Sequence, residues 1–360
     1  MSAADFKMIR PLTITDAILT STTVPETIAA TYAGGTTYAA GDRAGLAPVY
    51  GDPQLVYESL SAGNVGNALP VPPATTTAYW KYVGTVYMPY ASGSSCGIGG
   101  IVSSISTDVH LLYESLVAAN TGNPLSDTTK WLGSTAATQR ATNARAMFDT
   151  TYGSQTEAPD SIVTVLTPGA LVNSIFLGNL SAASVTVAQS VSGWSQTIPL
   201  TSHPVTDWYS WFYEDILMLG DAAITEIPPY AASTLTVTVA NAGATAKCGI
   251  CVIGKSATLG KTQWELMGSY RSYSGTTTNT FGNTTFLART GVKLLNLDVH
   301  IQAGYESEAF RLLTLYTDMP MVFIGSTDYN MAMVYGYLGN WSIPVSNSGK
   351  TAPIELIGLT

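Results

Sequence analysis

The chain has 360 residues, a length that suits about two to four domains better than one hydrophobic core. Only 11% of its residues are charged, so the sequence lacks much of what long helices favour, whereas its Thr, Val, Tyr and Gly favour strands and turns. The net charge of −9 argues against a nucleic-acid partner, because an acidic surface repels phosphate and no run of Lys and Arg offsets it. We therefore expect a mainly β protein with no nucleic-acid partner.

The cysteines and the N-terminal residues indicate where the protein is made. Three cysteines in a chain of this length form no complete disulfide framework, which suits a reducing cytoplasm. Residues 1–19 carry charges where a signal peptide requires an apolar stretch. No apolar run approaches the roughly 18 residues that a membrane span requires. We expect a protein that is made in the cytoplasm, without an export signal or a membrane span.

A repeated motif occupies part of the N-terminal half. Residues 55–67 read LVYESLSAGNVGN and residues 111–123 read LLYESLVAANTGN, at an offset of 56 residues. Each copy continues to a tryptophan, Trp80 in the first and Trp131 in the second. Each also combines a short apolar run with Gly and Asn turn residues, which is typical of a small β-unit. The sequence therefore predicts a duplicated β-module of about 50 residues.

The repeat places aromatic, glycine and proline residues in a fixed order. The first copy contains Tyr38, Gly41, Asp42, Tyr57, Gly66, Pro70 and Trp80. The second keeps Tyr113, Gly122, Pro124 and Trp131 but not the Gly-Asp pair, since YASGS at 90–94 is only a weak echo of YAAGD at 38–42. Over residues 32–133 this pattern resembles small carbohydrate-binding modules of the chitin-binding type-3 kind.

The resemblance implies glycan binding by aromatic side chains, because aromatic rings stack against the apolar face of a sugar. The candidate carbohydrate-binding residues are Tyr57, Tyr79, Trp80, Tyr82, Tyr113 and Trp131. In the second strand of the first module, alternation places Tyr79 and Lys81 opposite Trp80 and Tyr82, so that one of the two faces is the outer one. The alternative is that Trp80 and Trp131 form the cores of the modules and bind no sugar.

The rest of the chain predicts further β-structure. Short apolar runs between turn residues, about 10 to 12 residues apart, indicate an antiparallel β-sandwich. Near the C-terminus, the segment Glu306–Asp318 is the best helix candidate and lies between expected strands. We expect an N-terminal segment, two modules, a connector, a β-sandwich and a small α+β unit, at residues 1–31, 32–85, 86–135, 136–160, 161–284 and 285–360 respectively.

Cys248 and Cys251 have the spacing of a redox or zinc motif. A redox cysteine requires a helix N-terminus, however, and this motif lies in an expected strand whose residues i and i+3 face opposite sides. A zinc site requires a second pair of ligands, and none has suitable spacing. We expect two buried thiols, without a disulfide, a metal or any other cofactor.

The remaining polar motifs predict no catalytic site. The three histidines, His110, His203 and His300, are scattered, and although Asp298 and His300 could share one face of a strand, no nucleophile motif accompanies them. Glu214 and Asp215 are adjacent and would point apart in a strand, unlike the paired carboxylates of a glycosidase. The sequence therefore favours a non-catalytic protein.

Several segments of the C-terminal two thirds resemble tail or baseplate proteins of tailed bacteriophages; these are residues 143–156, 207–219, 227–239, 248–264 and 272–290. The resemblance implies a structural virion protein of the tail, assembled in the host cytoplasm. Its partners would be other copies of itself, other virion proteins and host-surface polysaccharide. Two alternatives stay open: a head-decorating virion protein, and a secreted polysaccharide-active enzyme, which would need an export signal and a catalytic motif.

Overall fold

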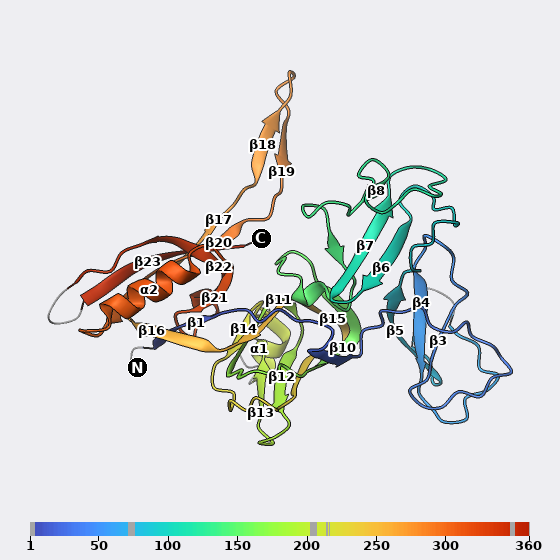
Figure 1. Ribbon diagram of the computed structural model, residues 1–360, viewed down its shortest axis with the longest axis horizontal. Helices are drawn as coiled ribbons and strands as arrows, with labels where there is room; N and C mark the ends of the chain where they lie inside the picture. Colours follow the sequence, from blue (N-terminus) through green and yellow to red (C-terminus); the bar gives the residue numbers. More distant parts are fainter. Residues whose placement is uncertain are drawn as a thin grey trace.

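The computed structural model describes residues 4–70, 76–201, 207–213, 215, 217–345 and 350–359. The expected mainly β fold is confirmed, because antiparallel sheets account for most of the regular structure. Figure 1 shows a central body with the two modules on one side, a helix-covered sheet on the other, and a hairpin that projects away from the body. Among the described residues, no helix is both long enough and apolar enough to span a membrane.

The helix-covered sheet has seven strands in the order β16-β1-β21-β22-β23-β20-β17. They are β1 (Asp5–Ile9), β16 (Ser256–Thr262), β17 (Met267–Arg271), β20 (Val292–Ile301), β21 (Met321–Ile324), β22 (Met333–Trp341) and β23 (Lys350–Gly358). The expected helix is present as α2 (Glu306–Tyr316). Its residues Ala309 and Leu313 are buried against one face of the sheet, so that α2 forms the outer layer.

The central sheet is organised around one long strand, β15 (Leu235–Gly254). β15 pairs with β10 (Thr156–Leu166), with β12 (Ser184–Gln189) and with β11 (Ser174–Ser181). The sheet also contains β2 (Leu19–Thr22), β13 (Ser195–Pro199) and β14 (Ala222–Ile224). Alternate residues of β10, β12 and β15 are buried in one large apolar core, as the alternating sequence of these strands requires.

The two sheets pack face to face through a smaller apolar cluster. Ile9, Val322 and Tyr335 of the helix-covered sheet meet Phe176 and Ile250 of the central sheet. A polar contact spans the same interface.

That polar contact is centred on Asp221, which is 5% exposed. Lys293 Nζ lies 2.6 Å from its Oδ2, and the hydroxyl of Tyr152 donates to its Oδ1 at 2.8 Å. Lys293 also donates to the carbonyls of Asn330 and Met333, at 3.2 and 3.1 Å. Asp221 is buried and Lys293 is half-buried, so the ion pair and its hydrogen bonds join the two packed layers, although such a pair contributes little net stability.

The expected boundaries at residues 31 and 284 do not follow the sheets. The strands β1 and β2 of the N-terminal segment are integral to the helix-covered sheet and the central sheet, respectively. The strands β16 and β17 lie before residue 284 but belong to the helix-covered sheet. Local alternation predicts where a strand lies, but the distant edge with which it pairs depends on tertiary structure.

Each repeat forms its own small sheet. The first contains β3 (Arg43–Gly45), β4 (Gln54–Ser59) and β5 (Trp80–Val86). The second contains β6 (Ile101–Ser106), β7 (Val109–Ser115), β8 (Trp131–Leu132) and β9 (Arg140–Ala141), the last of which lies in the expected connector. The remaining elements are β18 (Gly275–Thr278), β19 (Thr284–Leu287), α1 (Trp208–Tyr213) and the short 3-10 helices Ala146–Phe148 and Asn330–Ala332.

Cys248 and Cys251 lie in β15, as expected, but the expectation that they face opposite sides is wrong. Both thiols are free and are buried in the same core. Asn179 on the neighbouring strand has a φ of 53°. A β-carbon on Gly249 would lie 2.6 Å from that of Asn179. This local irregularity interrupts the simple alternation of the strand between the two cysteines.

We predict that none of the three cysteines reacts with iodoacetamide in the folded protein at pH 8.5. Burial raises the pKa of Cys251 to about 12 and also raises the pKa of Cys248 and Cys96, so the reactive thiolate is scarce and shielded. Mass spectrometry should find no adduct on the native chain and three after unfolding in guanidinium. Rapid native labelling at either β15 cysteine would contradict the burial described above.

Candidate functional site

A buried asparagine organises the first module. Asn64 Nδ2 donates to Ser59 Oγ at 3.1 Å and to the carbonyl of Tyr79 at 3.3 Å. Asn67 Nδ2 donates to Asn64 Oδ1 at 2.8 Å. The indole Nε1 of Trp80 in turn donates to the carbonyl of Asn67, also at 2.8 Å. These bonds join the turn after β4 to the start of β5, where the tryptophan enters the core.

The second module repeats this network bond for bond. Asn120 Nδ2 donates to Ser115 Oγ and to the carbonyl of Lys130, both at 3.1 Å. Asn123 Nδ2 donates to Asn120 Oδ1 at 2.8 Å, and Trp131 Nε1 donates to the carbonyl of Asn123 at 3.1 Å. The two segments therefore share one fold, and the Gly-Asn turns of the repeat are part of its frame.

The residues that precede the first strand of each module align differently from the alignment expected from the sequence. The backbone N–H of Tyr38 donates to Asn64, and the corresponding bond in the second module comes from Cys96 to Asn120. Tyr32 stands edge-on to Trp80 at a centroid distance of 5.8 Å, as Tyr90 does to Trp131 at 5.9 Å. Residues 90–96 thus correspond to 32–38, so YASGS is not the counterpart of YAAGD.

Three of the six candidate sugar-binding rings are wrongly assigned. Tyr57 and Trp80 are 0% exposed, and Trp131 is 2% exposed. All three form the apolar cores of their modules, where no sugar can stack against them. The open alternative for the two tryptophans is the correct one, because a unit this small depends on large aromatic side chains for its core.

The other three rings are accessible to different degrees. Tyr79 is 46% exposed and lies just before β5. Tyr113 is half-buried and packs against the core of the second module. Tyr82 is half-buried, with its ring 5.7 Å from that of Tyr57, and it also lines a cleft outside the module core.

That cleft has a volume of about 580 Å³ and lies between the first module, the second module and the central sheet. Its lining combines aromatic, amide and charged side chains, namely those of Tyr82, Tyr87, Arg140, Asn143, Gln155 and Glu157. Only Tyr82 was a candidate from the sequence. The others come from separate segments that the fold brings together, and no local motif marks them.

The cleft tyrosines have hydroxyl groups that can bind a ligand. Neither the hydroxyl of Tyr82 nor that of Tyr87 makes a hydrogen bond with any described residue. Burial raises the pKa of both, so both hydroxyls are protonated at neutral pH and can donate as well as accept. Arg140 is 51% exposed, and its distance of 3.9 Å from Glu114 is long for an ion pair. Its guanidinium is therefore accessible from the cleft. The cleft therefore offers ring surface beside free polar groups.

Tyr50 joins the two modules. In the first module, the hydroxyl of Tyr38 accepts a hydrogen bond from the backbone N–H of Ala33 at 2.9 Å. The second module has Cys96 in place of this tyrosine. There, the hydroxyl of Tyr50 reaches across from the first module, accepts from the N–H of Ala91 at 2.8 Å and donates to its carbonyl at 3.2 Å. The first module thus supplies a side chain that the second has lost.

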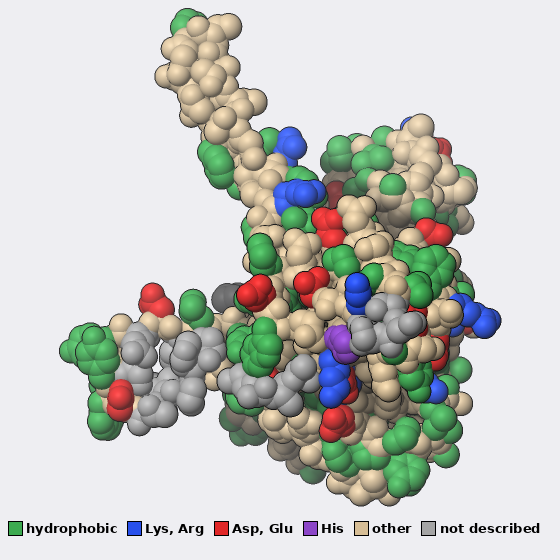
Figure 2. All heavy atoms as spheres, turned by 90° about the vertical axis from the view of Figure 1, so that its left-hand side faces the viewer, with side chains coloured by type: hydrophobic (Ala, Val, Ile, Leu, Met, Phe, Trp, Pro, Cys, Tyr) green, Lys and Arg blue, Asp and Glu red, His purple; other side chains and the backbone are tan. Residues whose placement is uncertain are grey.

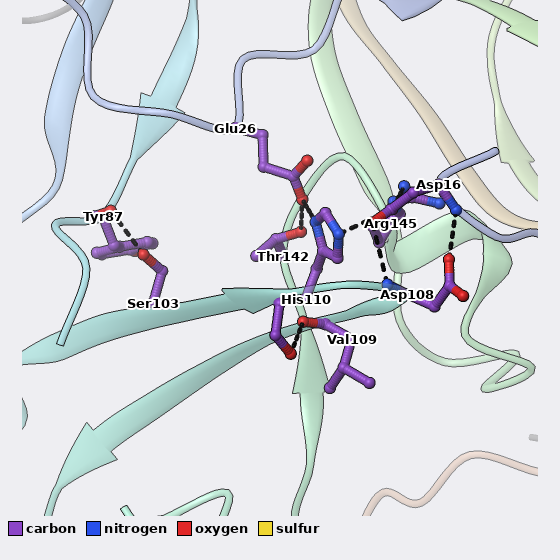
Figure 3. A network of polar contacts seen from close by, with 10 residues as sticks. Asp16, Glu26, Tyr87, Ser103, Asp108, Val109, His110, Thr142 and Arg145 are labelled. Atoms are coloured by element: carbon purple, nitrogen blue, oxygen red, sulfur yellow. Dashed lines mark hydrogen bonds and ion pairs between the residues drawn. The ribbon is translucent and has the colours of Figure 1, made fainter. Parts of the chain in front are cut away.

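A charged network attaches the second module to the body (Figure 3). The ring of His110 is 8% exposed, with Nδ1 2.8 Å from Glu26 Oε1 and Nε2 2.9 Å from Asp16 Oδ1. Thr142 donates to Glu26, and Arg145 forms an ion pair with Asp16. His110 is thus held between two carboxylates of the N-terminal segment, which gives it a structural role in this fold.

The other polar candidates from the sequence that the structure describes do not come together in one site. No group of three or more His, Cys, Asp or Glu side chains in the described ranges could hold a metal ion. His203 and Glu214 lie outside the described residues. His300 lines a separate surface pocket with Lys261 and Glu308. No protein-family model matches the sequence, and no curated protein shows significant similarity to it.

We predict that Tyr50→Phe selectively loosens the second module. The substitution removes the two hydrogen bonds to Ala91 and should cost about 1 kcal/mol. Hydrogen exchange measured by mass spectrometry should accelerate in residues 90–131 and stay constant in residues 32–46. The matched control is Tyr79→Phe, because that hydroxyl bonds to no described residue. Equal exchange in Tyr50→Phe and wild-type protein would exclude the bridging role.

We also predict that the attachment of the second module weakens in acid. The N–H of Asp108, at 3.0 Å, contributes most to holding the pKa of Asp16 below its ordinary 3.8; His110 and Arg145 add to this effect, and burial opposes it. A lowered carboxyl pKa stabilises the fold above the unfolded-state pKa and loses this effect as the pH falls through the folded-state value.

Asp16→Asn should therefore melt at a lower temperature than wild type at pH 7, and the difference should shrink below about pH 4. Differential scanning fluorimetry across this range tests the expectation. Asp52→Asn, which removes an exposed carboxylate outside this network, is the control. A difference between Asp16→Asn and wild type that is the same at every pH would contradict it.

Proposed function

We propose that the protein is a structural, non-catalytic virion protein of a bacteriophage tail or baseplate that binds host-surface glycan through its tandem modules. It assembles with other copies of itself and with other virion proteins. The proposal is supported by the β-rich fold, by the duplicated module with its aromatic residues, and by the low content of charged residues.

The observation that carries the glycan-binding part is the cleft between the modules. Sugars present apolar ring faces together with many hydroxyl groups, so their sites combine aromatic surface with hydrogen-bond donors and acceptors. The cleft provides Tyr82 and Tyr87 with free hydroxyls, beside the guanidinium of Arg140 and the side chain of Gln155. The amide nitrogen of Gln155 donates to the carbonyl of Asn179 at 2.9 Å, and its amide oxygen accepts no hydrogen bond from any described residue.

The cleft favours a neutral or anionic saccharide unit. Glu157 is already paired with Lys247 at 2.6 Å, so its charge is largely compensated. Arg140 is the most accessible charge in the lining. A single aromatic contact is worth on the order of 1 kcal/mol, so one cleft would bind weakly, and firm attachment would come from several copies acting together.

We predict that Tyr82→Phe, Tyr87→Phe and Arg140→Gln each weaken glycan binding several-fold. Each phenylalanine keeps the ring and its packing but removes a hydroxyl, a change of about 1 kcal/mol or about fivefold in affinity. The probes are immobilised chitin, peptidoglycan and O-antigen polysaccharide, with retention of the purified chain measured by biolayer interferometry. Tyr230→Phe, at a site 48% exposed outside the modules and the cleft, is the control.

Two outcomes would contradict the proposal. If no polysaccharide retained the chain even when it was displayed in many copies, the modules would be architectural. If a polysaccharide retained the wild-type chain and all three cleft variants equally, the glycan would bind elsewhere. Circular dichroism of each variant establishes that a loss of binding does not come from unfolding.

A further inference from the structure

The projecting hairpin, residues 272–288, is an arm that pairs with no other strand among the described residues. It contains β18 and β19, which pair with each other, and apart from Ser274 every one of its residues is exposed. Figures 1 and 2 show it extending away from the body. An isolated two-stranded hairpin is at best marginally stable in water. The arm therefore calls for a surface to pack against.

The tip of the arm presents one large apolar side chain. Phe281 is 88% exposed, the highest value among the large apolar side chains that the structure describes. Asn279 shapes the turn, because its Oδ1 accepts from the N–H groups of Phe281 and Asn283, at 3.0 and 2.9 Å. An ordered turn thus holds Phe281 outward, as an anchoring residue at an interface would be held.

A pocket that fits this anchor lies near the base of the arm. It has a volume of about 220 Å³ and is lined by the apolar side chains of Trp264, Leu266, Tyr329 and Met331, with Glu265 and Asp328 among the polar residues. An apolar cavity of about 150 Å³ can hold benzene, so the pocket has room for a phenyl ring. Glu265 has a φ of 76°, a strained conformation for a residue other than glycine.

The distribution of charge favours another copy of this chain as the occupant. The pocket lining contains two carboxylates and no Lys or Arg. From residue 266 to residue 297 the only charged residues are Arg271, Arg289 and Lys293, although the whole chain has a net charge of −9. Neither arginine forms an ion pair with a described residue. Residues 272–288 carry no charge themselves, and Arg271 and Arg289 flank the base of the arm, so the arm meets no repulsion at the acidic surface of a second copy.

An arm cannot fill the pocket of its own chain. The strand from Ser272 to Thr280 spans roughly 25 Å when extended, and it leads away from the pocket residues that immediately precede β17. The tip of the arm and the pocket are therefore far apart on each chain. A contact between them joins copies head to tail, and such contacts close into a ring when the rotation between copies allows it.

We propose that the arm of one copy inserts Phe281 into the pocket between Trp264 and Met331 of a second copy, and that this contact builds the oligomer. The inference deepens the assembly part of the proposed function and does not depend on glycan binding. Its test measures contact between chains, so its failure and a failure of the glycan proposal can be told apart.

The experiment uses site-directed cross-linking of the full chain. Thr280→Cys places a thiol beside the tip and leaves Phe281 intact, while Asp328→Cys places one at the pocket. The two variants are mixed and treated with a short bismaleimide. We expect a covalent dimer that requires both variants, because the native cysteines are buried. Val191→Cys, at a site 57% exposed on the turn after β12, replaces Asp328→Cys as the matched control.

Adding Phe281→Ser to the Thr280→Cys chain should reduce the dimer yield at least about tenfold, because it removes the anchor. The ring of Phe281 is 88% exposed among the described residues, so this variant should fold normally. A yield that is unaffected by Phe281→Ser, or equal with Val191→Cys, would overturn the proposal. So would a wild-type chain that is monomeric in sedimentation at 100 micromolar, or an arm that binds phosphatidylcholine vesicles instead of a second copy.

Discussion

The N-terminal segment holds the parts of this protein in one arrangement. Its first strand, β1, lies inside the helix-covered sheet, and its second, β2, lies at an edge of the central sheet. Between and after these strands, Asp16 and Glu26 enclose His110 of the second module. One stretch of chain therefore contacts both sheets and a module, and their relative placement depends on it.

Much of the fold follows from local patterns in the sequence. The alternating runs of the central sheet, the helix α2 and the repeated module are all visible without a structure, because each depends on residues close together in the chain. The ambiguity over Trp80 and Trp131 could not be resolved in this way. An aromatic ring suits both a small core and a sugar platform, and only the surrounding contacts distinguish the two.

The candidate site was less predictable than the fold. Tyr82 stood in a recognisable aromatic run, but Tyr87, Arg140 and Gln155 lie in three other segments that meet only in the folded chain. The faces of Cys248 and Cys251 were mispredicted for a related reason. The positive φ of Asn179 on a neighbouring strand disturbs the alternation, and the signal for it within the Cys-Gly-Ile-Cys motif is Gly249, since a glycine inside a strand marks an irregularity or a close approach.

Because the hydroxyl of Tyr50 reaches from the first module into the second, the two modules cannot be exchanged independently. A duplicated unit begins as two self-sufficient copies, each of which can be moved, lost or multiplied. Once one copy supplies a side chain that the other lacks, the two copies together are the smallest unit that can be transplanted intact. The second module grafted alone onto another scaffold would lack a side chain that its own sequence no longer encodes. The first module keeps Tyr38 and would need no such side chain from its neighbour.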